Sequence, residues 1–521
     1  MSSASSSPFL SMGADTFQIP LSMFADNRQR LIEQLPEESI VYLTGGPSPT
    51  RFDTDHEPVF RQESYFFWLT GVKEPDCSVI VQKFGSNGDS KAHCTLLIPE
   101  LPASYATIMG KIRSLTEWKD LYKVDATMYT HQADSYLEGL LSKSDRTQLL
   151  LLEGKNTDSG NIYSPPTFQS ELLQTKSNSS LLFPVLAECR VIKSQQELAL
   201  LEHVAQISSF AHAYVMRNVK PGMMEYQCES LFRHYAYYNY GCRLVSYTSI
   251  CGCGPNAAIL HYGHAGEPNS RQIGPDDNCL FDQGAEYQCY ASDITCSFPA
   301  NGKFSDKFLS IYMGVLNAQI AVYELAKPGV SYVDCHKAAE LEILKALEGM
   351  GIVIRHNETL EQLVEKRLGA VFMPHGLGHF IGLDTHDVGG YLDGHPERSA
   401  LPGLKSLRTS RILKENMTLT VEPGLYFIDH LLDEALCDPD LSKHLDKIKL
   451  EAYRGYGGCR LEDVVQITKD GLVNFTVAPR TAQEVEFVMA GGMWPPTKDE
   501  APELRRLHLT KPVPLGPPPS L

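Results

Sequence analysis

A ten-residue segment occurs twice in this chain. Residues 219–228 read VKPGMMEYQC and residues 326–335 read AKPGVSYVDC, so Lys-Pro-Gly and a cysteine seven positions after the proline recur at an offset of 107. Proline ends a helix and glycine supplies the turn after it, so each copy predicts a short connection between two helices. Helical patterns flank the copies over 207–217, 229–238, 314–325 and 336–348. The repeat predicts two related halves.

A match of this length can arise by chance, and the segments after each copy are a stronger indication. Strand-like segments with acidic or imidazole side chains come next, Asp282 and Asp293 after the first copy and His379, Glu422 and Glu462 after the second. Two related α/β halves that face each other would bring these five side chains to one shared cleft.

The five side chains have the chemistry of metal ligands. They lie in the stretches LFDQG, ASDIT, HGLGH, TVEPG and RLEDVV, which are apolar or glycine-rich. Four carboxylates, one imidazole and no thiolate suit a hard or borderline divalent metal. Four carboxylates are too many for one catalytic metal but fit two metals with bridging ligands. Turn or capping roles for the aspartates, and a packed histidine, are the alternatives.

Local patterns place these residues at the ends of strands. Residues 278–299 read as neighbouring antiparallel strands, and 416–427 alternates up to Glu422 before a Pro-Gly turn. Residues 460–468 read as one further strand, on which Arg460 precedes Glu462 by two positions and could orient a ligating carboxylate. A surface pair of Arg460 and Glu462 is the alternative. The run 373–390 also contains His375 and His386, and not all of its imidazoles need be ligands.

Composition argues against several classes of protein. The chain has 521 residues and a formal charge of −17, which argues against nucleic acid or an anionic membrane as a main partner. Apolar runs such as Leu149 to Leu152 are too short to span a bilayer, and the N-terminus lacks the pattern of a signal peptide. Thirteen scattered cysteines without a CxxC pair predict reduced thiols in a cytoplasmic protein.

The sequence predicts an α/β (α+β) protein of two domains between flexible ends. We expect a Ser-rich disordered start over 1–15, an α/β domain over 16–187, a catalytic domain over 188–490, and a Pro-rich disordered tail over 491–521. Strand patterns recur in the first domain at 39–46, 77–84, 92–101 and 148–154. Ser194 and Glu197 form a capping-box pattern that opens a long helix in the second domain.

Longer motifs identify a family. The blocks RQESYFFWLTGV, ILHYGHAG, ASDITCSFPANGKF, FMPHGLGHFIGLDTHDVGGY, LRTSR, TLTVEPGLYFIDHLLDEAL and RGYGGCRLEDVV, spread over roughly residues 12–490, resemble the metal-dependent pita-bread peptidases. Within them the chain is most similar to enzymes that cleave Xaa-Pro dipeptides. The resemblance implies an aminopeptidase P-like N-terminal domain and a pita-bread catalytic domain of two pseudo-symmetric halves.

The resemblance also implies roles for individual residues. Asp282 would hold one metal, His379 and Glu422 the other, and Asp293 and Glu462 would bridge the two. The catalytic residues would be Glu422, which carries a proton, and His386, which stabilises the oxyanion. The substrate-binding residues would be His261, Arg408, Tyr247, Ile250 and Arg460.

The implied cofactor is a pair of divalent ions, with manganese the family expectation. The ligand set by itself would also admit Co²⁺, Zn²⁺ or Mg²⁺. The implied substrate is an Xaa-Pro dipeptide, which yields free proline or hydroxyproline and would place the enzyme in proline metabolism and collagen degradation. A homodimer is also expected, and the first domain could serve dimer formation.

Three alternatives remain open. An Xaa-Pro aminopeptidase, which cuts longer peptides, would use the same five ligands, so Arg408 is the residue that discriminates. For Arg408 itself the alternative is a basic surface loop with Lys405 and Arg411. A pita-bread binding protein without catalysis should lack one or more of the ligands, and all five are present.

Overall fold

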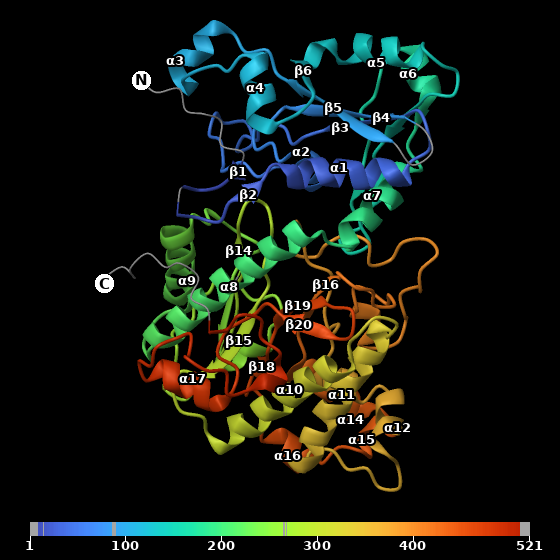
Figure 1. Cartoon of the computed structure of the whole chain (residues 1–521). Helices are drawn as coiled ribbons and strands as arrows, with labels where there is room; N and C mark the ends of the chain where they lie inside the picture. The colour runs from blue at the N-terminus through green and yellow to red at the C-terminus, as the bar shows by residue number, and fades with distance from the viewer. Residues whose placement is uncertain (1–8, 14, 86–89, 264–265, 267, 511–521) are drawn as a thin grey trace. The chain divides into compact units, whose positions relative to one another are not determined.

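The structure, a computed structural model, describes residues 9–13, 15–85, 90–263, 266 and 268–510. Its contacts divide the chain into two compact units, Met1–Val191 and Ile192–Leu521, whose elements are labelled in Figure 1. Both units mix helices and strands, so the predicted α/β class is confirmed. The division falls a few residues after the predicted boundary at 187/188, because helix α7 (Leu182–Val191) continues past it.

The first unit contains a mixed sheet with the strand order β10-β7-β3-β4-β5-β6. β3, β4 and β5 are antiparallel neighbours, whereas β7, β10 and β6 join in parallel. The four predicted strand segments all form strands of this sheet. One face packs on α5, where Leu137 meets Ile40, Ile80 and Leu149 in a buried cluster. The elements of this unit, besides α7, are β1 (Phe9–Leu10), β2 (Ile19–Pro20), α1 (Ser22–Gln34), β3 (Ser39–Thr44), α2 (Ser64–Thr70), β4 (Ser78–Phe84), β5 (Lys91–Ile98), α3 (Ala106–Met109), α4 (Leu115–Tyr122), β6 (Ala126–Tyr129), α5 (Ala133–Leu141), β7 (Gln148–Leu151), β8 (Gly154–Lys155), β9 (Ile162–Tyr163), α6 (Glu171–Lys176) and β10 (Ser177–Asn178).

The second unit repeats a helix pair followed by small antiparallel sheets. The sheets are β11-β14 and β12-β13-β15 after the first pair, and β16-β19-β20 and β17-β18 after the second. The elements are α8 (Gln195–Asn218), α9 (Glu225–Tyr240), β11 (Leu244–Val245), β12 (Ile250–Cys253), β13 (Asn278–Asp282), β14 (Ala285–Glu286), β15 (Thr295–Pro299), α10 (Asp306–Leu325), α11 (Tyr332–Gly349), α12 (Leu360–Glu365), α13 (Gly369–Phe372), β16 (Thr418–Val421), β17 (Gly424–Tyr426), α14 (Asp429–Cys437), α15 (Pro439–Ser442), α16 (Lys447–Glu451), β18 (Gly458–Arg460), β19 (Asp463–Ile467), β20 (Leu472–Asn474) and α17 (Ala482–Met489).

The two Lys-Pro-Gly segments occupy equivalent positions, as the repeat predicted. One connects α8 to α9 and the other connects α10 to α11. Gly222 and Gly329 both have a positive φ, 93° and 90°, which glycine adopts without strain. The Gly222 amide donates to the Ile273 carbonyl at 2.8 Å, and the Gly329 amide donates to the Leu413 carbonyl at 2.9 Å. Matching backbone bonds at matching positions support two related halves.

The long helices of this unit are built as their sequences predict. The capping box at the start of α8 is present, with the Glu197 amide donating to Ser194 Oγ at 3.2 Å and the Ser194 amide to the Glu197 carboxylate at 2.8 Å. Leu198 and Leu201 lie on its buried face. α10 is, by length and composition, apolar enough to cross a membrane, but 56% of that window is buried in the fold, as in the core helix of a globular protein.

The ligand-bearing strands differ from prediction at one point. β13 and β15 are antiparallel neighbours, with Asp282 opposite Thr295. The predicted single strand over 460–468 is wrong, because the chain is interrupted between β18 and β19, which pair with different strands. In the break, the Glu462 amide donates to the Thr295 carbonyl at 3.1 Å. Glu422 lies in the corresponding break between β16 and β17.

The two ends of the chain are more ordered than composition suggested. Phe9–Leu10 pairs with Ile19–Pro20, so the expectation of a disordered start differs from the structure there, while residues 1–8 and 14 lie outside the described residues. Residues 491–510 also differ from the predicted disordered tail: Trp494 Nε1 donates to the Val477 carbonyl at 2.7 Å, and Leu504 is fully buried. The prediction of disorder rested on the number of prolines and did not take into account the buried side chains of Trp494 and Leu504. Residues 511–521 lie outside the described residues.

Candidate metal centre

The five predicted ligands come together from separate segments of the second unit. Asp282 ends β13, Asp293 precedes β15, Glu422 and Glu462 lie in the two strand breaks, and His379 lies in the segment between α13 and β16. Their ligand atoms form three overlapping groups, each with all atoms within 4.8 Å of one another. The groups are Asp282–Asp293–Glu462, His379–Glu422–Glu462 and Asp293–His379–His386.

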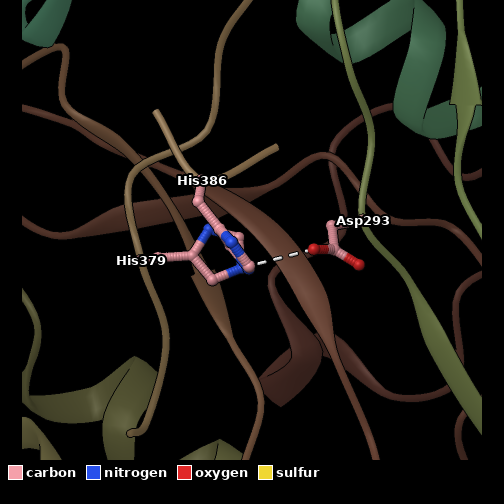
Figure 2. Close-up of side chains that lie close together, drawn as sticks. All are labelled: Asp293, His379 and His386. Carbon is pink, nitrogen blue, oxygen red and sulfur yellow. Dashed lines mark ion pairs between the residues drawn. The ribbon is translucent and has the colours of Figure 1, made fainter. Parts of the chain in front are cut away.

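His379 is at the centre of the cluster. Its Nε2 atom lies 3.2 Å from Asp293 Oδ2, 3.4 Å from Glu422 Oε1 and 4.0 Å from Glu462 Oε1. Figure 2 shows the His379 ring beside that of His386 with Asp293 opposite; the two rings meet edge to face with 4.5 Å between centroids. Nδ1 of His379 lies 2.9 Å from the Phe380 carbonyl, which orients the ring so that Nε2 faces the carboxylates.

Hydroxyl and guanidinium donors fix the carboxylates. Thr295 Oγ1 donates to Glu462 Oε2 at 2.7 Å, and Thr420 Oγ1 donates to Glu422 Oε1 at 3.2 Å. The Tyr247 hydroxyl donates to Asp282. These donors orient the carboxylates of Asp282, Glu422 and Glu462, as groups around a metal site orient its ligands.

Arg460 also acts on this cluster. Its Nη2 donates to Asp282 Oδ2 at 2.6 Å, its Nε to Thr295 Oγ1 at 3.0 Å and its Nη1 to the Tyr426 hydroxyl at 2.9 Å. Arg460 and Glu462 are 4% and 2% exposed, so they do not form a surface pair. The contact to Asp282 makes Arg460 a group that orients a candidate ligand.

The pKa values reflect a concentration of buried negative charge. Burial, and then the charge of Asp293, raise the pKa of Asp282 to about 7. Burial and the neighbouring carboxylates raise the pKa of Glu462 well above its usual range. For Asp293 burial acts in the same direction, but hydrogen bonding and charge from His379 outweigh it and lower the pKa. Burial lowers the pKa of His386 to about 2, with help from the charge of His379.

These residues fit a pair of divalent cations. Asp293 Oδ1 is buried and has no hydrogen-bond partner within the described residues, and a buried carboxylate oxygen is costly in that state. Four carboxylates share one buried region with the His379 imidazole and the Arg460 guanidinium. Two of the three ligand groups have Glu462 in common, so two adjacent ions could share it. Oxygen donors with one imidazole suit hard or borderline metals.

The expected substrate-binding residues lie around the cluster at different depths. Arg408 is half-buried, and its charge lowers the pKa of Glu422 and of His386. Lys405 is exposed and Arg411 is buried, so the three do not form one basic surface loop. The guanidinium of Arg408 is therefore within electrostatic reach of the centre.

The other expected residues fall into two sets. His261 is exposed, and its charge lowers the pKa of both His375 and His386. Tyr247 contacts Asp282 directly, and Ile250 lies opposite Asp282 in the register of β12 and β13. Tyr247 and Ile250 thus border a candidate ligand, whereas His261 reaches the site from its exposed side.

Sequence reasoning passed over several neighbours of the centre. Thr295 contacts both Glu462 and Arg460, and Tyr426 contacts Arg460 and lies 3.0 Å from His375 Nε2. Strand alternation could have identified Thr295 as a neighbour of the centre. Side chains two positions apart share a face of a strand, and Asp293 precedes Thr295 by two positions. Tyr426 is fully buried inside the strand β17, where an aromatic residue reads as core.

Comparisons with known proteins agree with this fold and this centre, which together define a metallopeptidase. Residues 199–469 match Metallopeptidase family M24, and residues 24–150 match the Aminopeptidase P, N-terminal domain. The chain therefore belongs to metallopeptidase family M24.

Individual proteins show how similar the chain is to known members of this family. The chain is 48% identical to the Xaa-Pro dipeptidase of Homo sapiens over 494 residues, covering 94% of this chain and 97% of the human one. It is 33% identical to the "Probable Xaa-Pro aminopeptidase pepP" of Talaromyces marneffei, covering 89% of this chain and 96% of that protein. Among solved structures, the Asp260Ala form of Escherichia coli aminopeptidase P matches at a TM-score of 0.72 with 29% identity, covering 91% of this chain and 99% of that one.

Proposed function

We propose that this chain is a metal-dependent Xaa-Pro dipeptidase that releases C-terminal proline or hydroxyproline from dipeptides. The observation that carries the proposal is the buried cluster of Asp282, Asp293, His379, Glu422 and Glu462, in which Asp293 Oδ1 has no partner among the described residues. The likeness to the human Xaa-Pro dipeptidase, close to half of all aligned positions, supports the substrate class.

The cluster would hold two ions, which we propose to be Mn²⁺. Asp282 would bind one ion, His379 and Glu422 the other, and Asp293 and Glu462 would contact both. When bound, such a pair supplies an activated water and a Lewis acid for the scissile carbonyl. Co²⁺, Zn²⁺ and Mg²⁺ are the competing identities that the donor set admits.

Glu422 is the proposed proton carrier between the attacking water and the leaving nitrogen. Its side chain is 16% exposed, more than those of the other four, which lie between 2% and 11%. It is thus the member of the cluster with most access to a bound substrate. A carboxylate that accepts a proton and returns it to the leaving group accelerates both halves of an amide hydrolysis.

His386 is the proposed oxyanion donor. Its lowered pKa keeps the ring neutral at physiological pH, so one ring nitrogen carries a proton that it can donate. The edge-to-face contact with His379 holds the ring beside the metal ligands. A fixed donor of this kind stabilises charge that develops on the carbonyl oxygen.

Arg408 is the proposed anchor for the proline carboxylate. A guanidinium can bind a carboxylate with two parallel hydrogen bonds, and Arg408 reaches the centre electrostatically. His261, Tyr247, Ile250 and Arg460 would complete the surroundings of the substrate. The scissile Xaa-Pro bond is a tertiary amide without an N–H, so recognition must come from the two ends of the dipeptide rather than from the bond itself.

The wider biological setting is also a proposal. We propose a cytoplasmic homodimer that acts on proline-containing dipeptides, including those from collagen degradation. None of the thirteen cysteines forms a disulfide, and all but Cys189 and Cys437 are buried, which supports a reducing compartment.

The decisive experiment compares two substrates. Purified protein with added Mn²⁺ should hydrolyse Gly-Pro but not Gly-Pro-Ala. Replacing Arg408 by Met should raise KM for Gly-Pro, while Lys405→Met, an exposed lysine in the same loop, should leave it unchanged. Efficient cleavage of Gly-Pro-Ala would favour an Xaa-Pro aminopeptidase, the activity named for the fungal relative. No hydrolysis of either peptide by metal-replete protein would indicate a binding protein.

A further inference from the structure

A fully buried histidine lies behind the metal centre and outside the proposed chemistry. His336 is on α11 with no exposed surface. Its Nδ1 accepts a hydrogen bond from the Leu377 amide at 3.1 Å. Leu377 is the residue midway between His375 and His379 in the HGLGH motif. The imidazole therefore binds the backbone of the segment that carries a candidate metal ligand.

The same peptide segment also holds a second candidate ligand. The Leu377 carbonyl accepts from the Glu422 amide at 2.8 Å, and the His379 carbonyl accepts from the Thr420 amide at 2.9 Å. The segment thus pairs with the end of β16, where Glu422 lies. Any displacement of Leu377 would move His379 and Glu422 relative to the rest of the cluster.

A buried ion pair lies on the other side of the imidazole. Because Nδ1 accepts a hydrogen bond, the proton of a neutral ring is on Nε2, which lies 3.3 Å from Glu340 Oε1. Glu340 is fully buried and bound by both terminal nitrogens of Arg367, with Nη1 to Oε2 at 2.7 Å. Arg367 in turn donates from Nε to the Pro402 carbonyl at 2.9 Å. The Leu377 bond thus sets the tautomer of a neutral His336 ring, while Nε2 lies beside the Glu340–Arg367 pair without a hydrogen-bond partner among the described residues.

We propose that His336 is a positioning residue for the metal centre. Its Nδ1 holds the Leu377 amide, and through that peptide it sets the separation of His379 and Glu422. The buried Glu340–Arg367 pair lies against the Nε2 side of the same ring. A histidine that only fills the core would do so with any group of its size, whereas the positioning role requires an acceptor at the δ position. The inference rests on the ligand roles proposed for His379 and Glu422.

The test compares acceptors at different positions. In His336→Asn the side-chain oxygen occupies the δ position and can still accept from Leu377, whereas in His336→Gln the oxygen is one atom too far. His336→Leu has no acceptor. Mn²⁺ is titrated into each metal-free protein by calorimetry, and kcat and KM are measured on Gly-Pro. His444→Leu is the matched control, since His444 is 1% exposed and its Nδ1 lies 2.9 Å from the Ile354 carbonyl.

We expect Mn²⁺ affinity to fall about 10–100-fold in His336→Leu and His336→Gln, the range for groups that orient metal ligands. kcat should fall with it while KM changes little, and His336→Asn should stay within about threefold of wild type for both. His444→Leu should lose thermal stability but keep its Mn²⁺ affinity.

Two results would overturn the inference. One is equal Mn²⁺ affinity in the Asn, Gln and Leu variants, and the other is a loss in His444→Leu as large as in His336→Leu. If His336→Leu does not fold, the comparison of Asn with Gln still decides. A wild-type protein that binds Mn²⁺ but cleaves no Xaa-Pro peptide would refute the proposed function, while the affinity measurements would still test His336.

Discussion

Replacement of Arg460 by Met tests whether Arg460 keeps the candidate ligand Asp282 deprotonated. The guanidinium lies 2.6 Å from Asp282 and also binds Thr295 and Tyr426, all in a buried region. Removing one partner of a buried ion pair costs about 3–5 kcal/mol, because the remaining charge is left without compensation. The cost is avoided if the Asp282 carboxyl is protonated and therefore neutral.

The magnitude comes from the pKa of Asp282. That pKa is already raised to about 7, and Arg460 is one of the groups that hold it down. About 3 kcal/mol corresponds to roughly two pKa units, so the carboxyl would stay protonated at neutral pH. A ligand must lose its proton before it binds a metal, and each pKa unit above the solution pH costs about tenfold in affinity. Mn²⁺ affinity at neutral pH should therefore fall about 100-fold.

The assay is a titration of metal-free protein with Mn²⁺ across the range from about pH 6 to about pH 9, where Asp282 would titrate. The deficit of Arg460→Met should be largest at the acidic end and shrink as the pH rises towards the new pKa. Arg460→Lys, which keeps the charge, should fall between the two proteins. Arg506→Met is the control, since Arg506 is a buried arginine that pairs with Glu484 at 2.8 Å and with Asp499, away from these ligands.

A deficit that does not change with pH would refute this reasoning, because proton competition at Asp282 must weaken as protons become scarce. Unchanged affinity in Arg460→Met would show that the bond to Asp282 does not matter for metal binding. An equal deficit in Arg506→Met would show that general destabilisation is the cause.

Three further predictions concern the same structure. Asp293→Asn should lower kcat by well over 100-fold, more than changes in groups that only orient ligands, because a shared ligand loses its charge; near-normal turnover would contradict the two-metal assignment. In metal-free protein the free energy of unfolding should fall by up to about 4 kcal/mol as the pH rises from about 4 to about 7, since in that window the unfolded chain releases the Asp282 proton and the folded chain retains it. Denaturation of metal-free Asp282→Asn should show a shallower slope, because Glu462, whose pKa is also raised, still contributes, and an equal slope in both proteins would rule Asp282 out as a source. Trp494→Ala should cost about 3–5 kcal/mol of stability with kcat unchanged, because a buried indole and its bond to Val477 are lost; an unaltered melting curve would show that residues 491–510 do not support the fold.

Local sequence patterns predicted a helix or strand well where a single local pattern determines that element. The capping box at Ser194 and Glu197 set the start of α8, and the Lys-Pro-Gly segments set the helix pairs. The prediction failed at Glu462, where a β-rich run was read as one strand. Whether a chain changes partner strand in the middle of such a run depends on which strands lie beside it, and that is a tertiary property.

The chemistry of the centre was also readable from residue type. Each of Asp282, Asp293, His379, Glu422 and Glu462 has a plausible structural role when taken alone, and it is the set of four carboxylates and one imidazole that predicts a cation site. The sequence by itself thus indicated which groups are candidate ligands.

Only the tertiary structure decided how those groups are held. Arg460 contacts Asp282, which lies 178 positions away in the chain, and His336 binds the Leu377 amide 41 positions away. No periodicity or spacing encodes contacts of this kind, because they form only when separate strands and helices pack against one another. The pKa of Asp282 likewise depends on its burial and on Asp293 and Arg460 together. The sequence predicted the candidate ligands, and packing set their charge and their separation.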